Sequence, residues 1–118
     1  MSNGIGILQL RNCSNDLVWS ATITSFIEQP TALKVIFTNN YCGCEWSAGM
    51  IEADKIDNTG YLGTGELTAD DILKKSSAVE FKYIPENKNH HFRFEGRWLE
   101  RTDRYSLSIN IHKNATTN

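Results

Sequence analysis

The feature that most constrains this chain is an alternation of apolar and polar side chains that recurs in segment after segment. It is most regular in the second half, where three segments keep the same period. Their alternate inward positions are Val79, Phe81 and Tyr83, then Phe92, Phe94, Gly96 and Trp98, then Tyr105, Leu107, Ile109 and Ile111. Because successive side chains of a strand point to opposite faces, a period of two indicates a strand with one buried face. The pattern predicts an antiparallel sheet packed on a core.

The first half shows the same alternation less regularly. Further strands are predicted over 4–11, 17–24, 33–38, 42–50 and 60–67. In the 42–50 segment, the positions expected to point inward are Cys42, Cys44, Trp46, Ala48 and Met50. Clusters of Asn, Asp, Gly and Pro separate the segments, as is typical of turns. We therefore predict an all-β fold, an antiparallel meander of about eight strands that closes into a small barrel or folds into a sandwich.

One segment indicates a helix rather than a strand. Thr68 offers a hydroxyl for an N-cap, and Asp71 follows where an acid completes such a cap. Lys74 and Lys75 fall in the last turn, where positive charge complements the helix dipole. We predict a short helix of about two turns over 69–76.

Charged and aromatic residues predict how the last strands pair. Opposite charges on facing positions stabilise a pair of strands, and aromatic side chains favour facing one another. The expected cross-strand pairs are Lys82 with Glu95, Glu80 with Arg97, Trp98 with Tyr105, and His91 with His112.

Length and charge narrow the class of protein. The chain has 118 residues, which suits a single domain over 1–118. Its 12 Lys and Arg against 14 Asp and Glu give a net charge of −2, which argues against general nucleic-acid binding. No apolar run is long enough to cross a bilayer, and no secretion signal is recognisable. The odd cysteine count, Cys13, Cys42 and Cys44, favours free thiols and a cytoplasmic location.

The segment Asp54–Glu66 resembles the calcium-binding loop of EF-hand proteins, with Gly60 at the sharp turn and Glu66 at the bidentate position. However, Lys55 stands where the first acidic ligand is needed, and the preceding residues alternate as a strand. The residues at 58–60 equally suit a β-hairpin turn. A hairpin is therefore the favoured prediction for this segment.

The cysteines and histidines are the other candidates for chemistry. Cys42 and Cys44 would point the same way from a strand, but too few further ligands accompany them for a zinc site. Small buried hydrophobes are the favoured interpretation for both thiols. His90, His91 and His112 could converge at one end of the last hairpin. We predict no metal site and no cofactor, and we assign no catalytic residue.

The inward aromatic side chains are the most informative feature for function. They are expected either to fill a packed core or to line a cavity of at least about 300 Å³ that holds a small ligand. The residues expected to contact such a ligand are Trp19, Trp46, Trp98, Phe94 and Tyr105.

Three function classes remain open at this point. The first is a non-catalytic binding module that holds a small apolar or amphipathic ligand inside the barrel. The second is a protein–protein interaction module, of the inhibitor or immunity type, that uses an outer sheet face. The third and least favoured is an enzyme with a site near the His90, His91 and His112 end, with Glu45 as a further titratable group. The sequence specifies neither the ligand nor the oligomeric state.

Overall fold

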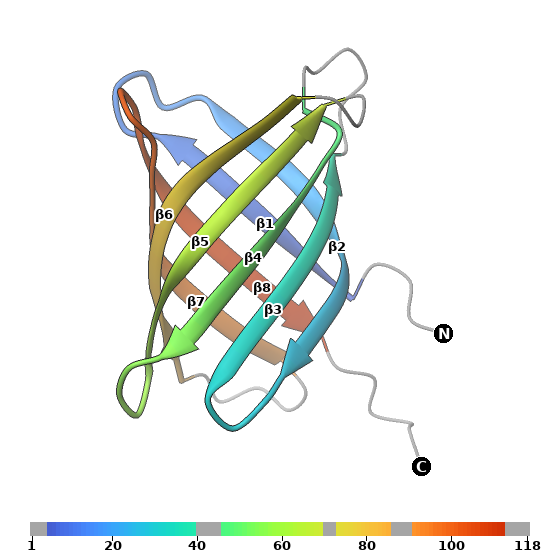
Figure 1. Ribbon diagram of the computed structural model, residues 1–118, viewed down its shortest axis with the longest axis vertical. Helices are drawn as coiled ribbons and strands as arrows, with labels where there is room; N and C mark the ends of the chain where they lie inside the picture. Colours follow the sequence, from blue (N-terminus) through green and yellow to red (C-terminus); the bar gives the residue numbers. More distant parts are fainter. Residues whose placement is uncertain (1–4, 40–45, 70–72, 86–90, 113–118) are drawn as a thin grey trace.

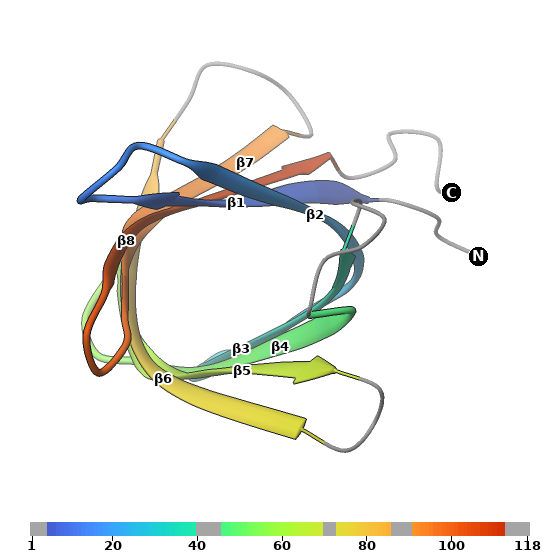
Figure 2. The ribbon, with the colours of Figure 1, turned by 90° about the horizontal axis from the view of Figure 1, so that it is seen from above.

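Eight antiparallel strands form a closed barrel in the computed structural model, which describes residues 5–39, 46–69, 73–85 and 91–112. The strands are β1 (Gly6–Asn12), β2 (Val18–Glu28), β3 (Ala32–Asn39), β4 (Ala48–Lys55), β5 (Gly60–Ala69), β6 (Leu73–Ile84), β7 (His91–Leu99) and β8 (Arg104–His112). Each pairs with the next along the chain, and β8 pairs with β1 (Figure 1). Figure 2 shows the strands surrounding one interior. The predicted all-β meander is confirmed in its closed form, which leaves no open sheet edge.

The four expected cross-strand pairs are all present. Lys82 faces Glu95, Glu80 faces Arg97, Trp98 faces Tyr105, and His91 faces His112. The Arg97 guanidinium donates to the Glu80 carboxylate, with Nε 2.8 Å from Oε2. This pair is solvent-exposed, so it fixes the register more than it stabilises the fold.

The core lies inside the barrel and is built from the alternating positions of every strand. Its fully buried members include Leu8, Ile23, Val35, Phe37, Ile51, Val79, Trp98, Leu107, Ile109 and Ile111. The inward positions predicted for the last three strands are correct, since those strands keep one uninterrupted period of two. The part of the chain that the structure describes contains no apolar helix of membrane-spanning length.

The predicted helix over 69–76 is wrong for the residues that the structure describes. Ala69 ends β5, and 73–76 begin β6. The ladder continues through this region, with Thr68 facing Lys74 and Ala69 facing Leu73. A helix of two turns is marginal on its own, whereas each residue added to a sheet gains ladder hydrogen bonds. Residues 70–72 lie outside the described residues. Within the described residues, the structure contains no helix.

The fourth strand differs from its prediction in position and in the face that it buries. It runs over Ala48–Lys55, and its inward positions are Gly49, Ile51 and Ala53 rather than Ala48 and Met50. The pairing with β3 sets this choice, because Phe37 is fully buried opposite Gly49 and needs the space that a glycine leaves. The predicted Cys42 and Cys44 positions lie outside the described residues.

A β-bulge in β2 changes which side chains of that strand point inward. Ile23 faces Phe37 while Ser25 faces Ile36, so Thr24 is an extra residue on β2. Such a bulge shifts the alternation by one. Phe26 therefore joins the core beyond the bulge, although it is out of phase with Ile23.

The β4–β5 connection is the predicted hairpin. The Asp57 carboxylate oxygen Oδ1 accepts from the backbone N–H of Thr59 at 3.0 Å and of Gly60 at 2.6 Å. The Ile56 N–H donates to the Gly60 carbonyl at 2.9 Å, and strands flank both sides. The segment is thus a side-chain-capped turn between strands, not a helix-flanked calcium loop.

Removing the Asp57 carboxylate is expected to lower stability in a pH-dependent way. The two N–H donors lower the pKa of Asp57, so its ionised form stabilises the folded state above the unfolded pKa of about 3.9, and this contribution is lost as pH falls through the lower folded pKa. Asp57→Ala should lower the Tm at pH 7, and the difference from wild type should shrink below about pH 4. Thermal unfolding followed by circular dichroism at several pH values tests this, with Asp54→Ala as the control. A gap that stays constant with pH would contradict it.

Candidate functional site

Aromatic rings fill the end of the interior where β2, β4 and β6 end, which is the lower end in Figure 1. Phe94 is buried there and packs against four other rings, with centroid distances of 5.9 Å to Phe26, 6.0 Å to Tyr61, 5.9 Å to Phe81 and 5.6 Å to Tyr83. Burial, and secondly the Glu28 carboxylate, raises the pKa of Tyr61, as expected for a phenol among apolar rings. This cluster is a packed core, so Phe94 lies in it rather than in a cavity.

Trp98 fills the middle of the barrel. Its side chain is fully buried, and a Cβ placed on Gly65 of β5 would come within 2.4 Å of the indole ring. The indole Nε1–H donates to Glu100 Oε2 at 3.3 Å. The indole therefore contacts Gly65 of β5 and donates to the Glu100 carboxylate.

A cavity of about 120 Å³ lies at the upper end, where β1 ends and β2 begins. Its lining residues are Leu10, Trp19, Trp46, Leu67, Glu100 and Tyr105. The volume is smaller than the 300 Å³ expected from the sequence, because Trp98 and the aromatic cluster occupy the rest of the interior. It approaches the size of an engineered cavity, about 150 Å³, that holds a single benzene ring.

The strands and their ends position the two cavity tryptophans. Trp19 faces Leu10 across the β1–β2 pair, and its ring meets Phe37 edge-on at 6.0 Å and 74°. Trp46 precedes β4, and its carbonyl accepts from the Asn39 amide Nδ2 at 2.7 Å. The side chain of Asn39 at the end of β3 thus fixes the start of β4 where the indole enters the cavity.

Tyr105 and Glu100 come from the two sides of the β7–β8 hairpin. Tyr105 faces Trp98 on β7 and Asn12 on β1, so both neighbouring strands fix its backbone. Trp98 is the last inward position of β7, and Glu100, two residues later, points to the same side. The Glu100 N–H donates to the Asp103 carbonyl at 2.8 Å. The cavity therefore combines three aromatic rings, two leucines and one carboxylate.

Three of the five predicted contact residues, Trp19, Trp46 and Tyr105, meet at this cavity. Trp98 lies beneath it and reaches it through the hydrogen bond to Glu100, whereas Phe94 lies in the aromatic cluster. Sequence reasoning missed the remaining lining residues, Leu10, Leu67 and Glu100. The signal for Glu100 was its place two residues after Trp98 on the inward face.

The histidine end is separate from the cavity. The His91 and His112 rings stack at 4.6 Å and 7° on outward positions of β7 and β8, at the opposite end of those strands from Trp98 and Tyr105. His90 and Glu45 lie outside the described residues. Within the ranges that the structure describes, no group of three or more His, Cys, Asp or Glu side chains is placed to hold a metal ion.

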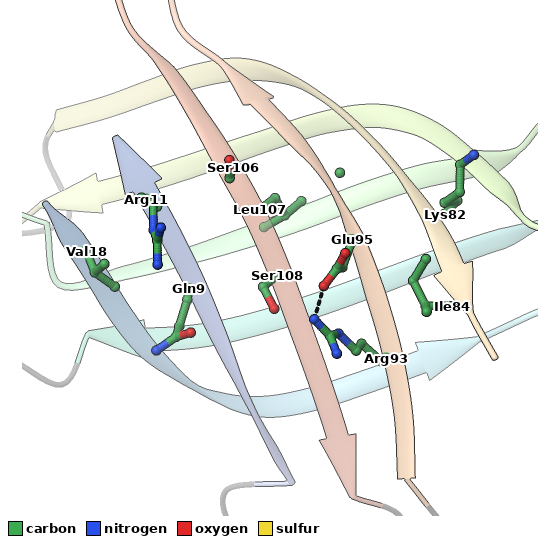
Figure 3. Close-up of a pocket in the computed structure, with 11 residues that line it drawn as sticks. Gln9, Arg11, Val18, Lys82, Ile84, Arg93, Glu95, Ser106, Leu107 and Ser108 are labelled. Atoms are coloured by element: carbon green, nitrogen blue, oxygen red, sulfur yellow. Dashed lines mark hydrogen bonds and ion pairs between the residues drawn. The ribbon is translucent and has the colours of Figure 1, made fainter. Parts of the chain in front are cut away.

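A shallow groove of about 610 Å³ crosses the outer face of the sheet (Figure 3). Side chains from five strands line it, and they include three cationic groups, Arg11, Lys82 and Arg93. One carboxylate, Glu95, pairs with Arg93. The groove is therefore polar, open and on balance positive.

No family model, curated protein or solved structure matched this chain in the comparisons made. The class of this protein is therefore defined by its fold and its cavity alone. The protein is a closed eight-stranded antiparallel barrel with an aromatic-lined cavity at one end.

Proposed function

We propose that the protein is a non-catalytic binding module that holds a small apolar or amphipathic group in the cavity lined by Trp19, Trp46 and Tyr105. The observation that carries this proposal is the contrast between the two ends of the interior. At one end Phe94 is packed among four other rings, whereas the other end keeps a cavity of about 120 Å³ lined by two indoles and a phenol. Aromatic rings around a space with one polar group are typical of small-ligand sites.

The size of the cavity sets the size of the ligand. About 120 Å³ admits a group comparable to one ring or a tert-butyl group, and a longer ligand would extend into solvent. Recognition would therefore rest on one compact apolar end of the ligand.

Titration with tert-butylethanol, the neutral carbon analogue of choline, tests this function. We expect quenching of tryptophan fluorescence and shifts of the Leu10 and Leu67 methyl signals, with a Kd of about 1 mM. Leu67→Phe, which fills the cavity, should weaken binding by about tenfold or more, whereas Phe94→Leu in the aromatic cluster should leave it unchanged. Both variants are first checked for a folded spectrum. Binding that is unaffected by Leu67→Phe would contradict the proposal.

A second candidate function rests on the outer groove. Its excess of positive side chains suits an acidic segment of a protein partner. The double variant Lys82→Glu, Arg11→Glu reverses this charge. It should abolish such a complex and leave the quenching of tryptophan fluorescence by the ligand intact. A complex that survives both reversals would exclude this groove as the interface.

We also propose a cytoplasmic location. Cys13 is an exposed free thiol in the structure, which suits a reducing compartment.

A further inference from the structure

We propose that the cavity recognises a quaternary ammonium group, an inference that rests on the proposed binding function and specifies its ligand. The composition of the cavity lining is the first reason. Trp19, Trp46 and Tyr105 present aromatic rings to the same space, and Glu100 adds the one carboxylate. Rings with a negative face, together with a carboxylate, favour a cation over a neutral group of equal size.

The two indoles matter most for this preference. Tryptophan provides the strongest cation–π contact of the aromatic side chains, and enclosure by several rings is the usual way in which proteins bind choline and methylated lysine. Trp19 is held edge-on against Phe37, and Trp46 is anchored through its backbone to Asn39. The contact with Phe37 limits the motion of the Trp19 ring, and the Asn39 hydrogen bond fixes the backbone of Trp46, which lowers the entropic cost of binding.

The lining also favours a methylated cation over a primary amine. A primary ammonium carries three N–H donors that need acceptors, and among the lining side chains only the Glu100 carboxylate and the Tyr105 hydroxyl can accept. A quaternary ammonium has no N–H and exposes methyl groups, so it loses no hydrogen bond on entering an apolar space.

Glu100 is placed to attract the cation without blocking the cavity. Its Oε2 accepts from the Nε1–H of the fully buried Trp98 indole at 3.3 Å. The hydrogen bond keeps the half-buried carboxylate beside the cavity that it lines, where partial removal from water strengthens its attraction for a cation.

The quaternary ammonium group could belong to a free choline-like compound or to a phosphocholine group. A neighbouring pocket of about 400 Å³ shares Glu100 and is lined by Arg97, Arg101 and Arg104. Guanidinium groups suit phosphate recognition. Phosphocholine therefore forms a separate arm of the test.

The experiment is calorimetric and methyl-NMR titration of the folded full chain with choline, phosphocholine and tert-butylethanol. Choline is expected to bind about tenfold more tightly than its neutral analogue. Glu100→Gln, whose amide oxygen still accepts from Trp98, should remove most of this preference and leave the analogue unchanged. Glu52→Gln, at an exposed position of β4, is the matched control and should keep it.

The outcomes separate the two proposals. Tighter binding of choline, with phosphocholine weaker, supports a free quaternary ammonium ligand. Phosphocholine binding that exceeds choline binding and falls with Arg101→Gln supports the headgroup as the source. Equal binding of choline and tert-butylethanol overturns the cation inference while leaving the ligand cavity intact. Binding of neither compound overturns both.

Discussion

Trp98→Ala is expected to lower the free energy of unfolding by about 3–5 kcal/mol, the largest effect of any single truncation in this protein. The indole is fully buried in the middle of the barrel, among strands that close around it. Removing it leaves a large void, and a closed sheet can collapse only partly because every strand is paired on both sides. The side chain also holds Glu100 through its Nε1–H, so that carboxylate loses a partner as well.

Urea denaturation followed by circular dichroism measures this effect through the midpoint and the slope of the transition. Trp46→Ala is the matched control, because Trp46 is only partly buried at the cavity rim. It should cost clearly less than Trp98→Ala. A loss below about 1.5 kcal/mol for Trp98→Ala, or equal losses for both variants, would show that the middle of the barrel does not depend on this indole.

Gly65→Ala is expected to destabilise the barrel by about 1–3 kcal/mol or more, although it adds a single methyl group. The new Cβ would lie 2.4 Å from the Cη2 and Cζ3 atoms of the Trp98 ring. The ring is rigid and fully buried, so relief of this contact requires a shift of the indole or of the β5 backbone.

A double-mutant cycle identifies the cause of this loss. In a Trp98→Leu background the ring is absent, and Gly65→Ala should cost less than it does in the wild type, with a coupling energy of about 1 kcal/mol or more. Chemical denaturation of the four proteins measures it. Additive losses would mean that the glycine is needed for its backbone conformation rather than for contact with the indole.

Much of the fold could be predicted because the alternation and the charges agree. In β7 and β8 each inward position is apolar or small, and the outward pairs Lys82–Glu95 and Glu80–Arg97 fix one register. Local pattern and long-range pairing point to the same structure there. The prediction of an eight-stranded meander, closed into a barrel or folded into a sandwich, rested on this alternation along the whole chain.

The prediction failed where two patterns competed. In β4, Ala48 and Met50 on one face are about as apolar as Ile51 and Ala53 on the other, and only the packing of Phe37 against Gly49 decides between them. The sequence contains no local mark of that contact. The Thr24 bulge was missed for the same reason, since a bulge is set by pairing with β3 rather than by local sequence.

The candidate site was predicted in part, since alternation states which side chains point inward but not how much space they leave. Trp19 and Tyr105 share an end of the barrel because β1 pairs there with both β2 and β8, and Trp46 joins them just before β4 begins. Phe94 has the same inward phase but lies at the other end. The position along the barrel axis depends on strand tilt and stagger, which the residue pattern does not contain.

The central claim is that an accessible cavity exists at one end of a barrel whose remaining interior is packed. The most direct measurement is a crystal structure of the protein under xenon pressure, because xenon enters apolar cavities of this size without needing polar contacts. The account predicts a xenon site between Leu10, Leu67 and the indole of Trp19. No xenon at that end, or a site only among Phe81, Phe94 and Tyr61, would contradict it.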